Sequence, residues 1–582
     1  MTDYKILPYV DDLIDSYEEP ITRIDDLQRS PKEIIKTVEF YSVDQYLSGN
    51  KDELGRDKPF INQGNSRVRV AKTATDIDVK DIKYEPDSLE YAVEAMLINH
   101  ELYKYLKESN FSLTLNDMGL TRPKYGHLLV KKYEDGEGLE IEVVDWVNVI
   151  FDPSDVTGGS IIERHYMDAS EVLKMSAWTG YDSVDEAVTA HAKANKNKPK
   201  KMEILEITGE FSYSFDPDNE ETDGNDKKFK TMCFYVAVVN KKKYLLYKED
   251  IKSIGDKYKD LAWEKIGKGF GRGVWEEGFE SQVWMNDMYI QHKNALDLSG
   301  KVFTKGSVKG LGNAIVGVDN GHHFELKPNE TMDAFQLSTN ALPVFENMIA
   351  KFAEEYNRIS STFDANTGEQ PPSGTPLGQT QILNQVANSP FQYQQEVWGI
   401  WLNELLSDWI FPYLKKKILK DHTLVSDFSD EELDIIDKDL VNEYANNAVV
   451  DKILGGGVIQ DDEQQMIQTQ AKDDLMKKYG KKREIKIPKG YLDIEGKLTA
   501  NITGELKNKG AILQSLNELI KAVTMSFNPN TGQYALLENP VLKKLFGQIV
   551  EMSGIPFSSA QLSAGQPTSM TAQATTAPAM GS

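Results

Sequence analysis

Apolar side chains recur every three or four residues along two stretches in the middle of the chain, which is the spacing of amphipathic helices. The first predicted helix covers 273–300, and its apolar stripe consists of Phe279, Val283, Trp284, Met288, Ala295 and Leu296. The second covers 341–360, with a stripe of Val344, Phe345, Ile349, Phe352 and Tyr356. One stripe is too little to bury a helix on all sides. We therefore expect the two helices to pair antiparallel and to leave a charged face in water.

A third periodic stretch, 379–420, predicts one long helix that contains a proline. Its apolar side chains are Ile382, Val386, Val397, Trp398, Trp401, Leu402, Leu405 and Trp409. At ~1.5 Å per residue such a helix is ~60 Å long. Pro390 should bend it, because the proline ring displaces the carbonyl group four residues back. An ordinary bent core helix has the same periodicity, and the pattern leaves that alternative open.

Two segments without helical periodicity separate these helices. Residues 301–340 contain AIVGVDNGHHFEL, in which short alternating runs flank Asn320-Gly321, a strong hairpin signal. So short a segment makes a poor core by itself, and we expect this β-containing insert to complete its core against neighbouring copies. Residues 361–378 are rich in Gly, Pro and Thr, which predicts a loop that can move.

The part of the chain before these helices mixes helical and strand patterns. Residues 1–85 read as a charged arm with short helical patterns, expected to pack on other parts of the chain or on other subunits. Residues 86–272 open with a helical pattern and continue with alternating apolar and polar runs, in which Asn240-Lys241 to Lys243 marks a hairpin turn. This arrangement predicts an α+β domain.

The part after Lys420 is acidic and mostly helical in pattern up to residue 556, with a strand pair at 483–505. The segment 557–582 has almost no side chain to bury, and we expect it to be disordered.

The chain carries 66 basic and 91 acidic side chains, a formal net charge of −25. Affinity for DNA comes mainly from Lys and Arg side chains that neutralise phosphates. This balance argues against a protein that grips nucleic acid, so a DNA partner would have to pass by the protein.

Cysteine content and hydropathy limit the cellular compartments that we expect for the protein. Cys233 is the only cysteine, which excludes an intrachain disulfide and a cysteine-based metal site and fits synthesis in reducing cytoplasm. The first residues are acidic where a secretory signal is basic. The longest apolar run, 233–239, is far shorter than the roughly 18 residues of a membrane span. We expect no membrane partner.

The glycine-rich sequence 267–273 permits two interpretations. Backbone N–H groups at a helix N-terminus bind phosphate. The GxxxxGK[ST] spacing of a phosphate loop is missing, however, and no clear apolar strand precedes the glycines. We favour a flexible hinge at Gly269, Gly271 and Gly273, which lets the next helix leave the α+β domain at a sharp angle.

Other candidate sites fail on spacing. The acidic loop 215–226 suggests calcium, yet in the register that begins at Asn219, position 12 of an EF-hand is Lys230 where Glu is required. The eight histidines form no ligand pattern, and we expect them at the surface. Cys233 lies in an apolar strand, where a thiol is usually inert. We expect no catalytic residue, metal or cofactor, which favours a structural or conduit role.

Several segments carry a family resemblance: VVDWVNVIFDPSD with IIERHYMDASEVLKM (143–155 and 161–175), GRGVWEEGFESQVWMND (271–287), TGEQPPSGTPLGQTQIL (367–383) and ITGELKNKGAILQSLNEL (502–519). They resemble the portal proteins of tailed bacteriophages, which form the ring through which the genome enters and leaves the capsid. Together they follow the order expected of that family. The resemblance implies a portal-type α+β fold with a wing (86–272), two stem helices (273–300 and 341–360), a clip (301–340), a tunnel loop (361–378), a kinked helix (379–420) and a C-terminal wing and crown (421–556).

The resemblance also implies a ring, usually of twelve copies, around passing double-stranded DNA. Acidic side chains that face the channel would repel phosphate at close range, an interaction that salt screens over ~8 Å. The candidates are Glu276, Glu280, Asp287, Glu354 and Glu355. Three lysines near the stem–clip junction are candidates for weak DNA contacts, with a solvated edge as the alternative: Lys301, Lys305 and Lys309. The tunnel-loop residues expected nearest the DNA are Thr367, Gly368, Glu369, Gln370, Pro371, Pro372, Ser373, Gly374, Thr375 and Pro376.

The partners implied by the resemblance are the large terminase, a head–tail adaptor protein, and the major capsid and scaffolding proteins. The implied location is the portal vertex of the virion. Two other classes remain open: a tail or baseplate scaffold without a channel, and an enzyme with an unrecognised site.

Overall fold

The computed structural model describes residues 4–306, 327–360 and 377–427 with short gaps, and beyond them the strand segments 482–486, 496–500, 527–528 and 533–534. The chain is a mixed α+β protein with several sheets, as the sequence pattern predicts. It divides into two compact units. The first unit consists of Met1–Ile82 and Leu102–Tyr413, and the second of Lys83–Glu101 and Leu414–Ser582.

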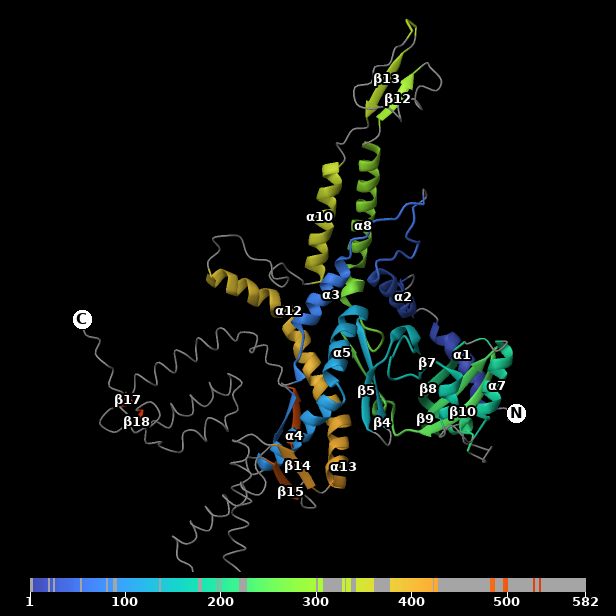
Figure 1. Cartoon of the computed structure of the whole chain (residues 1–582), viewed down its shortest axis with the longest axis vertical. Coiled ribbons are helices and arrows are strands. Elements are labelled where there is room, and N and C mark those ends of the chain that lie inside the picture. Colours follow the sequence, from blue (N-terminus) through green and yellow to red (C-terminus); the bar gives the residue numbers. More distant parts are fainter. Residues whose placement is uncertain are drawn as a thin grey trace, which may run out of the picture. The chain divides into compact units, whose positions relative to one another are not determined.

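A five-stranded antiparallel sheet, in the order β10-β9-β8-β7-β6, belongs to the first unit (Figure 1). Its strands are β6 (Val149–Phe151), β7 (Ile161–Met167), β8 (Met202–Ser212), β9 (Phe229–Val239) and β10 (Lys242–Asp250). The turn between β9 and β10 consists of Asn240 and Lys241, and both have positive φ. Two-residue hairpin turns require this backbone conformation, so the place of the predicted turn is confirmed. The turn is shorter than predicted, because Lys242 and Lys243 belong to β10.

Helices cover both faces of this sheet. α1 (Ile6–Glu18) packs on the face that presents Leu205. α6 (Ala169–Lys174) and α7 (Val184–Ala194) pack on the face that presents Ile204. Successive side chains of a strand point to opposite faces, which is why these adjacent residues belong to different cores. The first helix of the predicted N-terminal arm, α1, therefore packs as a layer on the five-stranded sheet of the first unit.

A second sheet in the first unit has the order β11-β4-β5. Its strands are β4 (His127–Glu134), β5 (Leu139–Val143) and β11 (Tyr258–Ala262). Three helices lie near it: α2 (Pro31–Ser42), α3 (Gln63–Ala74) and α5 (Phe111–Tyr125). A large apolar core joins them through buried aromatic side chains, including Tyr41, Trp146, Phe270 and Trp275. This core lies where the glycine-rich segment enters the first long helix.

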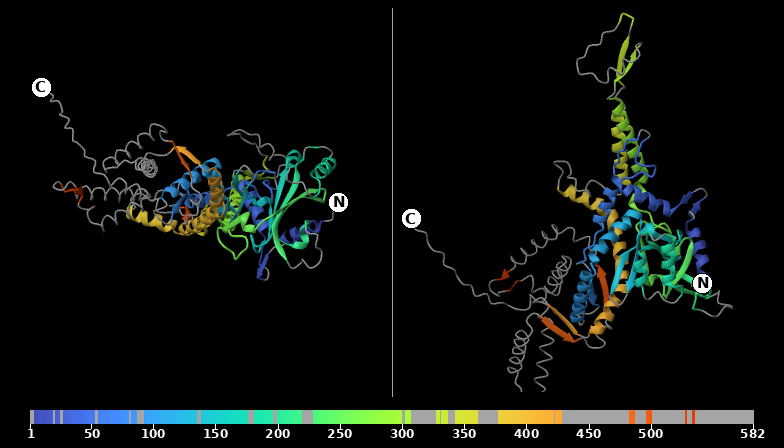
Figure 2. Two further views of the ribbon diagram at one scale, coloured as in Figure 1. Left: turned by 90° about the horizontal axis from the view of Figure 1, so that it is seen from below. Right: turned by 45° about the vertical axis from the view of Figure 1, so that its right-hand side comes forward.

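The two helices predicted in the middle of the chain are present as α8 (Val274–Ser299) and α10 (Leu342–Ile359). They lie side by side (Figure 1; Figure 2, right). Trp284 of α8 stacks on Phe352 of α10, and nearer the far end His292 approaches Phe345. The residue numbers rise along one helix as they fall along the other, so the pair is antiparallel, as predicted.

The β insert begins and ends with a strand pair. β12 (Val302–Gly306) follows α8, β13 (Met332–Gln336) precedes α10, and the two pair antiparallel from Val302↔Gln336 to Gly306↔Met332. The predicted hairpin at Asn320-Gly321 lies outside the described residues. The strand pair thus stands at the end of the helix pair (Figure 1).

The proline-containing helix is α12 (Leu377–Leu405), and its ribbon changes direction along its length (Figure 1). A π-helical turn, Leu406–Ile410, follows it without a break and leads into α13 (Phe411–Asp421). The sequence pattern did not predict the π-helical turn. Trp398, Trp401 and Trp409 are buried, so this helix is also a core helix of the first unit.

In the second unit, the described strands form three two-stranded pairs: β3 (Ile82–Pro86) with β16 (Gly496–Ala500), β14 (Thr423–Asp427) with β15 (Lys482–Lys486), and β17 (Phe527–Asn528) with β18 (Gln533–Tyr534). α4 (Ala92–Glu108) begins in this unit, where the side chain of Asn99 bonds both backbone groups of Tyr84. The predicted strand pair at 483–505 is not formed within itself, because β15 pairs with β14 and β16 with β3. Among the described helices of the whole chain, none combines the length and the hydropathy needed to cross a bilayer.

Candidate functional site

The glycine-rich segment before α8 is packed tightly against backbone. A Cβ atom added at Gly271 would lie 2.2 Å from the Gly126 carbonyl oxygen, and one at Gly273 would lie 2.5 Å from the Gly126 nitrogen. A Cβ atom at Gly269 would lie 2.5 Å from the Pro153 carbonyl oxygen. The three glycines are buried, and only Gly267 in this run has positive φ. Close backbone packing, and not the flexibility that we inferred from the sequence, accounts for them.

His127 binds the backbone of the glycine-rich segment. Its Nδ1 accepts a hydrogen bond from the Gly271 N–H at 2.9 Å, and its Nε2 lies 2.8 Å from the Asp260 carboxylate. Burial favours a raised pKa for Asp260, yet the bonds from His127 and Thr157 hold that pKa below its usual value. His127 and His191 are buried, so the expectation that the histidines lie at the surface is wrong for these two. In each case a hydrogen bond to the ring compensates for burial.

The N-terminal segment runs antiparallel along α8 and bonds to it at successive turns. The Gln282 side chain accepts from the N–H groups of Gln63 and Gly64 at 2.9 and 3.2 Å, so it caps the first turn of α3. The Asn286 side chain accepts from the Ile61 N–H at 2.9 Å. Near the far end of α8, Arg56 binds Asp297 at 2.8 Å. These contacts fix the direction of α8 relative to α3 and the segment that precedes α3.

The acidic candidates on the helix pair differ in environment. Glu280, Glu354 and Glu355 are exposed, and Asp287 is half-buried and accepts a hydrogen bond from Gln291 at 2.7 Å. Glu276 is different, because the guanidinium group of Arg29 binds both of its carboxylate oxygens. Its charge is therefore compensated within the chain. The structure brings Glu280, Asp287, Glu354 and Glu355 onto one antiparallel pair.

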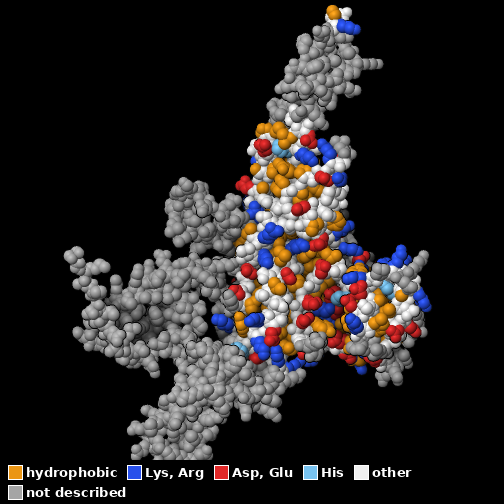
Figure 3. Space-filling view, in the orientation of Figure 1, with side chains coloured by type: hydrophobic (Ala, Val, Ile, Leu, Met, Phe, Trp, Pro, Cys, Tyr) orange, Lys and Arg blue, Asp and Glu red, His pale blue; other side chains and the backbone are white. Residues whose placement is uncertain are grey.

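The same helix pair exposes large apolar side chains (Figure 3). The exposed fractions are 53% for Trp284, 47% for Leu296, 59% for Val344 and 43% for Ile359. The apolar stripes that the sequence predicted are thus only partly buried by pairing of the two helices. Exposed apolar side chains that gather in a contiguous patch are typical of surfaces that contact another molecule.

Several predicted site residues lie outside the described residues. They are Lys301, Lys309 and the whole tunnel-loop set from Thr367 to Pro376. Lys305 belongs to β12 and stands opposite Asp333 of β13 in the register. The segment 557–582 is likewise outside the described part.

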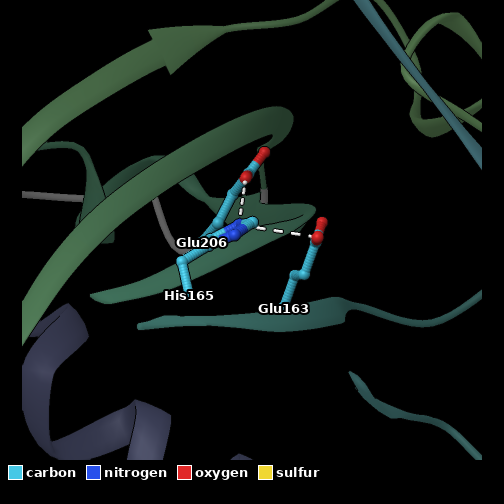
Figure 4. A group of neighbouring side chains, drawn as sticks. All are labelled: Glu163, His165 and Glu206. Carbon is cyan, nitrogen blue, oxygen red and sulfur yellow. Dashed lines mark hydrogen bonds and ion pairs between the residues drawn. The ribbon is translucent and has the colours of Figure 1, made fainter. Parts of the chain in front are cut away.

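A partly buried cluster of charged side chains, which the sequence did not predict, lies on the five-stranded sheet (Figure 4). Glu163 and His165 share one face of β7, and Glu206 of β8 stands directly opposite Glu163. The His165 Nε2 atom lies 2.9 Å from Glu206 and 3.6 Å from Glu163. Among the described residues, this is the one group of three side chains with ligand atoms close enough to share a metal ion.

Two lysine ammonium groups form ion pairs with the carboxylates of this cluster. Lys131 lies 2.5 Å from Glu206 and 3.2 Å from Glu163, and Lys257 lies 2.7 Å from Glu206. Burial by itself raises the pKa of Glu206, but Lys131, His165 and Lys257 hold that pKa well below its usual range. Two lysine charges balance the two carboxylate charges, so a divalent cation would have to displace an ammonium group. The geometry favours a structural ion-pair network over a metal centre.

The Cys233 thiol lies beside this network, 3.2 Å from Lys257 Nζ. Burial, followed by the Glu206 charge, raises the pKa of the thiol to about 11. The thiol is therefore neutral at physiological pH, consistent with the inert role inferred from its apolar strand.

The sequence matches no protein-family model and no curated protein. The functional interpretation therefore depends on the residues and their arrangement.

Proposed function

We propose that the chain is a portal protein of a tailed bacteriophage. Copies of it form a ring at one vertex of the virion capsid, and double-stranded DNA passes through the central channel during packaging, retention and ejection. In this proposal 86–272 is part of the wing, α8 and α10 form the stem, and the segment with β12 and β13 is the clip. The large terminase, a head–tail adaptor, and the capsid and scaffolding proteins are its partners.

The observation that carries the proposal is the exposed surface of the antiparallel α8–α10 pair. The pair leaves the α+β part of the first unit and ends in a small strand pair. It exposes large apolar side chains, Trp284 among them, and a set of carboxylates. Exposed apolar side chains that meet neighbouring copies, beside carboxylates that stay in water, suit one spoke of a closed ring. Carboxylates repeated around the axis would repel DNA phosphates at close range and let the duplex slide.

Three exposed or half-buried candidates best fit this channel face: Glu280, Glu354 and Asp287. Glu355, also exposed, neighbours Glu354 on α10. We leave Glu276 out of the proposed channel face, because its carboxylate is bound to Arg29. Lys301, Lys305 and Lys309 stay in the proposal as weak DNA contacts at the stem–clip junction, and Thr367–Pro376 as the loop nearest the duplex.

Electron microscopy of the purified full-length chain tests the proposal. We expect closed rings with a central hole. Assemblies without a hole would support the alternative of a tail or baseplate scaffold, and a stable monomer that turns over a substrate would support an enzyme. Either result would contradict the portal proposal.

A second test addresses the DNA path in assembled particles. Reversing the charges of Lys301, Lys305 and Lys309 together should change DNA retention while rings still form. Deleting Gln370–Pro376 should likewise spare ring assembly and impair packaging or retention. Full genomes held normally in both variants would contradict the proposed roles of these residues.

A further inference from the structure

A cavity of about 340 Å³ lies in the first unit, between the end of α1, the helix α2 and the strand β6. Its wall is mostly apolar, and two cationic side chains at its border, Lys36 and Arg164, lack a close carboxylate among the described residues. We propose that this cavity binds an amphipathic monocarboxylate, a molecule with one apolar body and one carboxylate group. The apolar body fills the cavity, and the carboxylate binds the two cations.

The apolar wall comes from segments that are far apart in the sequence. α2 contributes Ile35 and Phe40, the short turn before β6 contributes Trp146, and β6 contributes Ile150 and Phe151. β6 is the last strand in its sheet, so only β7 pairs with it among the described strands. Phe151 belongs to the core that contains Trp146, whereas Ile150 packs against the core under α1. The cavity therefore lies at the free edge of β6, between two cores.

The size of the cavity limits the apolar body of the ligand. Ligand cavities in proteins have volumes of ~300 Å³ or more and are mostly apolar, with a few polar groups that orient the ligand. A water molecule takes ~30 Å³ in the liquid, so the cavity holds roughly ten groups of that size. An unbranched chain of about ten carbon atoms fits this volume.

The acidic side chains at the border of the cavity already have partners. Glu18 binds Lys32 at 2.5 Å, and Glu39 binds Lys124 at 2.7 Å. Among the described residues, three basic and two acidic side chains line the cavity, which gives its border a net charge of +1. A single carboxylate neutralises this charge, whereas a cationic ligand would add to it.

Lys36 and Arg164 are the cations that remain for a ligand. Lys36 is exposed and has no ion-pair partner in the described part of the chain. The Arg164 Nε atom lies 3.7 Å from the Glu203 carboxylate, too far for a hydrogen bond, and is buried without another partner among the described residues. A buried donor without an acceptor is costly, and a carboxylate makes strong hydrogen bonds to ammonium and guanidinium groups. A ligand carboxylate would supply the missing acceptor.

The site belongs to a single chain. Every described residue that lines the cavity is in the first unit, and none is on α8 or α10. The inference therefore holds whether or not the chain forms a ring.

Isothermal titration calorimetry of the full-length chain with sodium decanoate, below its micelle concentration, tests the proposal. We expect a single decanoate per chain. Octanoate is shorter by two methylene groups and should bind about tenfold more weakly. Decyltrimethylammonium has the same apolar chain as decanoate and a positive head group, so it should not displace decanoate.

Replacing both cations, Lys36→Gln with Arg164→Gln, should weaken decanoate binding by about tenfold or more, because the charge-assisted hydrogen bonds are lost. Ile150→Trp, which fills the cavity, should abolish binding, and the double variant keeps the test if Ile150→Trp folds poorly. Lys174→Gln, at an exposed position of α6, is the matched control and should bind decanoate like the wild type. No binding of decanoate by the wild type would overturn the proposal, and so would equal binding by the wild type and the double variant.

Discussion

The guanidinium group of Arg29 binds both carboxylate oxygens of Glu276, with Nε···Oε1 at 2.9 Å and Nη2···Oε2 at 2.7 Å. The same guanidinium donates to the carbonyl oxygens of Phe270 and Gly271 at 2.6 and 2.7 Å. One side chain from the N-terminal segment thus holds the glycine-rich segment and the first turn of α8 together. Both charged side chains are mostly buried, so solvent screens the pair little.

Replacing Arg29 with Ala should therefore destabilise the first unit by about 1–3 kcal/mol, since it removes several charge-assisted hydrogen bonds and leaves Glu276 without them. Arg29→Lys should recover little, because an ammonium group does not match the planar bidentate geometry. Urea unfolding followed by tryptophan fluorescence measures the change. Arg69→Ala, at an exposed position of α3, is the control and should be close to neutral. Equal midpoints for all these variants would show that the Arg29 contacts contribute nothing to stability.

Gly273→Ala tests whether the glycines serve close packing or flexibility. The new methyl group would lie 2.5 Å from the Gly126 nitrogen, a backbone atom that has little room to move. We expect a loss of about 1–3 kcal/mol or more in the free energy of unfolding. Gly255→Ala, whose Cβ would meet only the Ser253 hydroxyl at 3.8 Å, should leave the midpoint nearly unchanged. If Gly273→Ala were as stable as the wild type, the segment would be looser than its contacts indicate.

Local sequence patterns predicted the helices and the hairpin turn whose formation depends on nearby residues. The stripes that begin at Phe279 and Val344 gave two helices whose observed bounds are Val274–Ser299 and Leu342–Ile359. The turn at Asn240-Lys241 could be predicted because the positive φ of a two-residue hairpin depends on local residues. The mixed α+β class followed from the change of period along the chain.

Contacts between distant residues could not be predicted in this way. Arg29 and Glu276 are 247 positions apart, and nothing in the pattern of either segment specifies the other. The partly buried cluster had a faint signal: Glu206 interrupts the apolar strand EILEITGEF, which is unusual for a strand with helices on both faces. Its partners Lys131 and Lys257 come from other strands or loops, so the register was needed to find them.

Glu206→Gln should destabilise the first unit strongly, by about 3–5 kcal/mol, because it leaves two buried ammonium groups without their carboxylate. The pKa of Glu206 is depressed in the folded chain, so its contribution is present above the unfolded pKa of about 4.3 and is lost as pH falls through the folded pKa. The difference between wild type and variant should thus be largest above about pH 5 and shrink in acid.

Unfolding curves measured from pH 3 to 8 give this difference directly. Glu210→Gln, at an exposed position of the same strand, is the control and should cost little at any pH. A Glu206→Gln penalty that did not change with pH would contradict the assignment of the ionised carboxylate as the stabilising group.

Zinc should not stabilise the chain through Glu163, His165 and Glu206, because Lys131 and Lys257 occupy the carboxylates that it would need. An ion that bound the folded state alone would add about 2.7 kcal/mol at one hundred times its dissociation constant. We expect no shift in the melting temperature with added zinc chloride. A zinc-dependent rise that His165→Ala abolished would contradict the ion-pair interpretation and restore the metal centre.

The exposed apolar side chains of the helix pair carry the last prediction, which depends on the proposed ring. Trp284 is 53% exposed in the single chain and stacks on Phe352 across the pair. Trp284→Ser should cost the isolated chain about 1 kcal/mol or less, since half of the ring already contacts water. In an assembly the same indole would be buried against a neighbouring copy, so its loss should weaken each of the repeated interfaces. Mass photometry should then show fewer rings and more free chains at equal concentration, whereas Leu113→Ser, 64% exposed on α5, should assemble normally. Unchanged assembly of Trp284→Ser would mean that this side of the helix pair is not the contact between copies.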